Sequence, residues 1–138
     1  MSIFDKLRGD TREPLSSKSA VLLGCILMAS ADGEIDDDEL AIVRRLDGSS
    51  DTSNWQAAVK AFQKLRRSDA IDAVCAALAS DHVMPFLANL IDLAMADGHL
   101  AGAEKDLLEV FCQKLEPDEQ FLEDAVTIIG IKNTLSTI

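Results

Sequence analysis

Apolar residues recur along most of the chain at steps of three and four positions. Between residues 17 and 29, Val21, Leu22, Cys25 and Ile26 fall on one side, as in a helix that buries a wide face. Runs of the same kind begin near Asp36, Ser53, Ser68, Pro85, Ala101 and Pro117. No segment sustains the period-two alternation of a half-buried strand. The pattern therefore predicts an all-α fold of about seven helices.

Polar residues at the breaks between these runs mark the expected helix ends. Gly33 follows the first run and suits a left-handed C-cap. Asp36 with Glu39, and Ser53 with Gln56, have the spacing of capping boxes that open the next two helices. The last run is rich in β-branched residues, which lowers its helix propensity, and no structure is assigned beyond residue 130.

One polar break occurs twice. Residues 31–39 read Ala-Asp-Gly-Glu-Ile-Asp-Asp-Asp-Glu, and residues 96–104 read Ala-Asp-Gly-His-Leu-Ala-Gly-Ala-Glu. The flanks match at the same offset, so that Ile42, Val43 and Leu46 fall on Leu107, Leu108 and Phe111. This duplication predicts two helical hairpins, at about 17–46 and 85–115, related by a pseudo-two-fold axis that brings the two Asp-Gly loops together.

Length and charge narrow the function classes. The chain has 138 residues, which is enough for one domain with a single core, and residues 1–14 are polar enough to form a mobile arm. Its net charge of -11 repels phosphate backbones and anionic lipid, which argues against nucleic-acid binding. No apolar run approaches the ~20 residues of a membrane span, so direct membrane insertion is not expected. Cations and basic partners are favoured.

The three cysteines, Cys25, Cys75 and Cys112, are odd in number and lack a CxxC spacing. Each lies among apolar neighbours in a helical run, which predicts buried thiols in a reducing compartment. The N-terminal residues lack the apolar core of a signal peptide. The expected location is therefore the cytoplasm.

Enzymatic chemistry finds little support in the residue types. The chain has two histidines and no tyrosine, and it contains neither a GxSxG elbow nor a glycine-rich phosphate loop. His82 falls in a turn and is interpreted as a solvated surface residue. His99, inside the second acidic loop, is a minor candidate ligand. We expect a protein that is not an enzyme.

The repeated loops carry the clearest chemical signal. Asp-Gly-x-Ile with a glutamate six residues after the glycine coincides with the second half of an EF-hand calcium loop. The first half of an EF-hand loop is not matched, because Met28 and Leu93 occupy its first ligand position and a hard cation prefers oxygen ligands. If the hairpins bring the loops together, the carboxylates of both would hold one Ca²⁺ or Mg²⁺: Asp32, Asp36, Glu39, Asp97 and Glu104. The alternative is that these residues only cap helices on a solvated acidic edge.

Basic residues gather in another part of the sequence. Lys60, Lys64, Arg66 and Arg67 follow Arg44 and Arg45 within one stretch of the chain. A solvated helix face explains this pattern, and the alternative is a docking surface for an acidic partner protein.

A helical pair closed by Ala-Asp-Gly-x-Ile/Leu and restarted around a glutamate, twice in a small acidic helical chain, resembles the TerB family of tellurite-resistance proteins. The resemblance covers residues 14–133 and implies an all-α fold of two related halves, bacterial cytoplasmic location and a role in tellurite or metal stress beside membrane-bound partners. Related modules occur at the N-terminus of membrane-anchored J-domain co-chaperones. The family's acidic positions, suspected of binding metal, fall on Asp32, Glu39, Asp97 and Glu104. The second loop departs at Ala101 and Gly102, where the acids of the first loop are missing.

We therefore expect a non-enzymatic module of a tellurite or metal stress response that binds a divalent cation and a protein partner. The alternative is a pure adaptor that docks its partner through the basic face.

Overall fold

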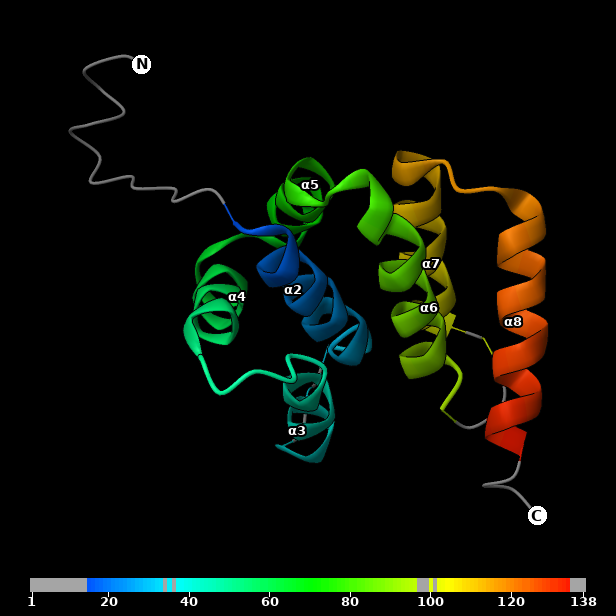
Figure 1. Cartoon of the computed structure of the whole chain (residues 1–138), viewed down its shortest axis with the longest axis horizontal. Coiled ribbons are helices and arrows are strands. Elements are labelled where there is room, and N and C mark those ends of the chain that lie inside the picture. The colour runs from blue at the N-terminus through cyan, green and yellow to red at the C-terminus, as the bar shows by residue number, and fades with distance from the viewer. Residues whose placement is uncertain (1–14, 34, 36, 97–99, 101, 135–138) are drawn as a thin grey trace.

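The computed structural model describes residues 15–33, 35, 37–96, 100 and 102–134 (Figure 1). These residues form seven α-helices and one short 3-10 helix, η1, and contain no strand, which confirms the all-α prediction. The elements in chain order are α2 (Ser17–Ala29), α3 (Asp37–Arg45), α4 (Ser53–Lys64), α5 (Arg67–Ala77), η1 (Ser80–His82), α6 (Val83–Ala94), α7 (Gly102–Leu115) and α8 (Glu119–Thr134).

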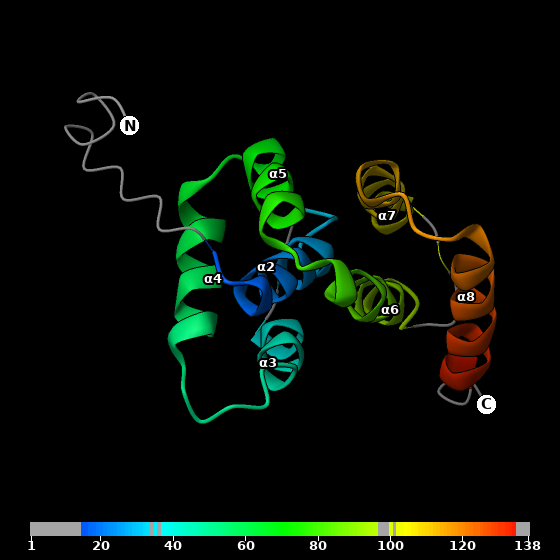
Figure 2. The ribbon, with the colours of Figure 1, turned by 45° about the horizontal axis from the view of Figure 1, so that its top comes forward.

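Helix α2 is the centre of the core. Nine of its 13 residues are buried, because α3, α4, α5, α6 and α7 all pack against it. Figures 1 and 2 show α2 with α4 and α5 on one side and α6 on the other. Its neighbour α6 buries Phe86, Leu87, Leu90 and Ile91, and the ring of Phe86 packs edge-on against that of Phe111 from α7, with centroids 5.1 Å apart. The periodic apolar runs of the sequence thus converge on one core.

A glycine sets the closeness of α2 and α6. A Cβ atom at Gly24 would lie well inside van der Waals contact with the Phe86 ring. Glycine in the middle of a helix costs about 1 kcal/mol relative to alanine, and here the missing side chain makes room for a large aromatic ring.

Polar contacts hold the N-terminal turn of α2. Ser16 caps the helix by accepting the Ser19 N–H at 3.0 Å, and its hydroxyl lies 2.7 Å from Oδ1 of Asn54 in α4. Lys18 Nζ lies 2.9 Å from Oδ1 of Asp47, a buried carboxylate in the loop after α3. That contact is an ion pair rather than a well-aligned hydrogen bond. These contacts tie α3 and α4 to the start of α2.

Several predicted boundaries shift. The capping box expected at Ser53 and Gln56 is wrong, because α4 starts one residue earlier: Thr52 is the N-cap and its Oγ1 accepts from Gln56 Nε2 at 3.0 Å. Helix α5 begins at Arg67, so Ser68 lies inside it. Pro85 lies in the first turn of α6, as predicted. The expected arm at 1–14 lies outside the described residues.

The two predicted hairpins correspond to α2 with α3 and to α6 with α7. Helices α2 and α6 pack against each other, and Figure 2 shows α3 and α7 on opposite sides of that pair. The pseudo-two-fold axis itself stays a prediction. No single described helix is long and apolar enough to cross a membrane; α5 and the η1–α6 segment reach that length only together, with a bend of 113° between them.

Candidate functional site

The first Asp-Gly loop is built by the end of α2. The Ser30 N–H donates to Ile26 O at 3.0 Å, and the Gly33 N–H donates to Ser30 O at 2.9 Å. Gly33 has φ of 95°, a left-handed conformation that strains any residue with a Cβ, so the glycine is required by this turn. Asp32 is exposed at the turn, whereas Ile35 is half-buried and packs against the core. The loop thus exposes the side chain of Asp32, while Ile35 fixes the loop to the core.

Helix α3 continues this acidic edge. Its first turn carries Asp37, Asp38 and Glu39, where the N-terminal end of the helix dipole stabilises negative charge. Glu39 is half-buried, while Asp37 and Asp38 are exposed. The expected N-cap, Asp36, lies outside the described residues.

The second loop follows α6 and is described in part. Met95 is the C-cap of α6; its N–H donates to Ile91 O at 2.9 Å and its side chain is buried. Leu100 is half-buried against the core, as its counterpart Ile35 is. Glu104 is half-buried in the first turn of α7, which begins at Gly102 with φ of 67°. Asp97, Gly98 and His99 lie outside the described residues.

Helix α8 holds the end of α6 next to this second loop. Asp92 Oδ1 receives hydrogen bonds from Lys132 Nζ at 2.9 Å and Asn133 Nδ2 at 3.0 Å, and Asn133 also donates to Met95 O at 2.9 Å. Partial burial alone would raise the pKa of Asp92, but the hydrogen bonds from Lys132 and Asn133 and the charge of Lys132 outweigh it and lower the pKa. Sequence reasoning missed this clamp, because it assigned no structure after residue 130.

The predicted metal ligands are therefore placed only in part. Asp32, Glu39 and Glu104 each lie where an Asp-Gly loop meets a helix, and Asp36 and Asp97 lie outside the described residues. Among the side chains that the structure describes, no three of the types His, Cys, Asp and Glu gather closely enough to hold a metal ion. Carboxylate oxygens suit a hard cation, so the chemistry of the set fits Ca²⁺ or Mg²⁺. The joint site stays a prediction.

A contact between η1 and α2 was also missed. The Ser17 hydroxyl lies 2.6 Å from His82 Nδ1, and Nε2 of the same ring lies 3.9 Å from Asp81 Oδ1. Serine, histidine and aspartate form the catalytic triad of hydrolytic enzymes. Here, however, Ser17 Oγ also accepts the Ala79 N–H at 2.9 Å, and the Asp81 side chain is largely exposed. The arrangement therefore fastens η1 to the start of α2. No local pattern predicts it, because 65 positions separate the serine from the histidine.

The thiols are poorly suited to nucleophilic or redox chemistry. All three cysteines are free, and burial raises the pKa of Cys25 to about 12. Burial also raises the pKa of the half-buried Cys75 and Cys112. The predicted burial is thus complete for Cys25 and partial for the other two.

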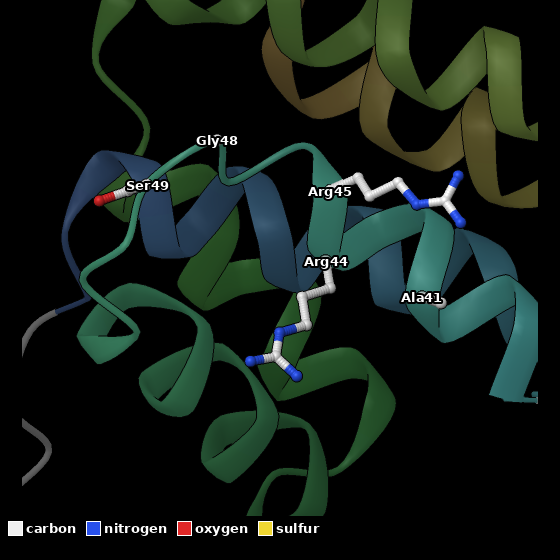
Figure 3. A pocket seen from close by; sticks show the side chains of 5 residues that line it. All are labelled: Ala41, Arg44, Arg45, Gly48 and Ser49. Atoms are coloured by element: carbon white, nitrogen blue, oxygen red, sulfur yellow. The ribbon is translucent and has the colours of Figure 1, made fainter.

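The basic residues lie at two places rather than on one face. Lys60, Lys64, Arg66 and Arg67 are exposed along α4 and at its junction with α5, whereas Arg44 and Arg45 end α3. Figure 2 shows that the loop from α3 joins one end of α4, whereas the connection to α5 begins at the opposite end. Arg44 and Arg45 border a shallow depression with Ala41, Gly48 and Ser49, and they point to different sides of α3 (Figure 3).

Comparison with known proteins identifies the family of this chain. The model of the family described as tellurite resistance protein TerB matches residues 18–126, from the first turn of α2 into α8. Searches of curated proteins and of solved structures returned no match. Because the match spans well over half of the 138 residues, the chain belongs to the TerB family.

Proposed function

We propose that this protein is a non-enzymatic binding or sensing module of a tellurite or metal stress response in the cytoplasm. Its ligand is a hard divalent cation, Ca²⁺ or Mg²⁺, held by the acidic Asp-Gly loops. Family membership supports the stress-response role. The raised pKa of Cys25 supports a binding role over thiol chemistry.

One observation carries the choice of the loops. Each follows a helix of the central α2–α6 pair and is anchored on the core by a matched apolar residue, Ile35 or Leu100. Each also leads into a helix whose first turn holds a half-buried glutamate, Glu39 or Glu104. An apolar anchor on the core limits the movement of a loop that carries carboxylates, which reduces the entropy lost when an ion is bound.

Neutralising the loops without disturbing helix caps tests the proposal. Asn caps a helix about as well as Asp, and Gln serves in a capping box as Glu does. The variant Asp32→Asn, Asp97→Asn, Glu39→Gln, Glu104→Gln therefore removes charge alone. Thermal unfolding of metal-free protein is followed across a Ca²⁺ and Mg²⁺ titration. At a cation concentration one hundred times the dissociation constant, the wild type should gain ~2.7 kcal/mol and the variant much less.

A charge-matched control separates specific binding from general screening. The variant Asp69→Asn, Asp124→Asn, Glu109→Gln, Glu123→Gln removes four exposed carboxylates elsewhere and should respond to the cation as the wild type does. Parallel titration curves for the wild type and the loop variant would show that the loops only cap helices. The loop variant would then even gain stability, because fewer carboxylates repel one another.

The second candidate function is an adaptor that docks an acidic partner, for example one bound at a membrane. Within the described part of the chain, ion pairs join Lys18, Lys114 and Lys132 to aspartates. Among the residues that the structure describes, no lysine or arginine between positions 44 and 67 forms an ion pair. Exposed, unpaired cations in a chain of net charge -11 favour an acidic ligand at this place.

Charge reversal distinguishes the two candidates. With Lys60→Glu, Lys64→Glu and Arg67→Glu, capture of the partner in a pulldown should be lost if the protein is an adaptor, while the neutralised loop variant should still capture it. The opposite result, capture that survives charge reversal and depends on the loops and the cation, would reject the adaptor.

A further inference from the structure

Helix α3 and the turn after it expose apolar residues whose counterparts in α7 are buried. The duplicated sequence pairs Ile42 with Leu107 and Leu46 with Phe111. Ile42 is 47% exposed and Leu46 is 40% exposed, whereas Leu107 and Phe111 are 1% and 0% exposed. Among the described residues of α3, only Val43 is fully buried.

The difference follows from the neighbours of each helix. Helix α7 packs against α6, α5 and α2, so its apolar side is covered. Helix α3 packs mainly on α2, and within the described residues no further helix covers Ile42 and Leu46. Figure 1 shows α3 at the edge of the molecule, away from α5 and α8. The exposed side therefore has the composition of a helix interface without a partner.

The charges beside these residues indicate which partner fits. At 3.6 residues per turn, Asp38, Ile42 and Arg45 fall within about a sixth of the circumference of α3, and Leu46 follows directly in the turn after the helix. We call these four residues the α3 face. All four are exposed. The acid lies near the start of the helix and the base near its end, with Ile42 between them. Two such faces placed antiparallel bring each acid opposite a base and the two isoleucines together.

We propose that the α3 face is a self-association surface, on which a second copy of this chain docks with its own α3 antiparallel about a two-fold axis. In this pair, Asp38 of each copy faces Arg45 of the other, and Ile42 and Leu46 lose contact with water. Such an isologous contact closes after two copies and produces a dimer rather than a filament.

The size and charge of the protein set the strength of the contact. The exposed side of one short helix buries less than the ~800 Å² per partner of a stable complex, so the dimer belongs to the weak, transient class. Two chains of net charge -11 also repel each other. At physiological ionic strength, with a screening length of about 8 Å, that general repulsion is reduced while the short-range pairs persist. We expect dimers at protein concentrations of about 0.1 mM and above.

Sedimentation velocity of the full chain over a concentration series measures this equilibrium. Asp38→Arg and Arg45→Asp each replace two attractive pairs by two repulsive ones, so each should weaken dimerisation at least about tenfold. An equimolar mixture of the two variants should form a heterodimer, because each end then joins an arginine to an aspartate. The double variant Asp38→Arg, Arg45→Asp should dimerise as the wild type does.

Matched controls lie on the same helix. Asp37→Arg and Arg44→Asp make the same charge changes at positions that helix geometry places outside the α3 face, and they should leave dimerisation unchanged. Rescue in the mixture does not depend on the stability of either variant alone. A wild type that stays monomeric at about 1 mM overturns the proposal. A dimer that the single variants do not weaken also overturns it, and points instead to another exposed pair, such as Ile128 and Ile131 on α8.

Discussion

A single carboxylate, Asp92, links α6 to α8 beside the second loop. Its lowered pKa means that the folded state binds a proton there less readily than the unfolded chain does. The stability that it contributes is therefore fully present above the ordinary pKa of 3.8 and is lost as the pH falls through the lowered value. The contact is electrostatic and partly exposed to solvent, which limits its contribution to the free energy of unfolding.

Asp92→Asn should thus lower the free energy of unfolding at neutral pH by roughly 0.5–1 kcal/mol. The difference from the wild type should begin to shrink below pH 3.8, where the unfolded chain takes up the proton, and should vanish below the lowered pKa, where the folded carboxyl is protonated as well. Urea unfolding of both proteins at neutral pH and at a series of acidic pH values measures this difference in the free energy of unfolding. A difference that stays constant through that range would show that Asp92 acts through packing and not through its charge.

At the scale of elements, the closeness of α2 and α6 depends on Gly24. Alanine would be the better helix former by about 1 kcal/mol, but its Cβ would meet the Phe86 ring. Phe86 is fully buried and packs on Phe111, so it has little room to move. Gly24→Ala should therefore destabilise the protein by about 1–3 kcal/mol in spite of its helix propensity.

A second helical glycine provides the control for this prediction. A Cβ at Gly130 in α8 would meet only the flexible end of Met95, at 3.3 Å. Gly130→Ala should be neutral or stabilise the protein by up to about 1 kcal/mol. Thermal unfolding of both variants compares them directly. Equal effects would mean that helix propensity, and not the packing of α2 on α6, determines stability at Gly24.

Across the whole chain, the features that can be predicted from the sequence are those that short-range periodicity encodes. The all-α class and the helix pairs α2–α3 and α6–α7 follow from apolar spacing within each helix. Gly33 has the predicted left-handed backbone, but α2 ends at Ala29 with Ser30 as its C-cap, so the prediction that Gly33 caps this helix is wrong. Contacts between distant segments were not predictable this way, since neither Ser17 with His82 nor Asn133 with Met95 has a local signal. The exposure of Ile42 was likewise hidden, because its spacing is that of a buried residue.

We propose that the two Asp-Gly loops hold one cation together. The test is to follow the backbone amide chemical shifts of ¹⁵N-labelled protein as Ca²⁺ or Mg²⁺ is added. Joint binding predicts that the amides of residues 31–39 and 96–104 shift in parallel and saturate at one cation per chain. Shifts that are confined to one loop, or that grow without saturation across the acidic surface, would contradict the claim.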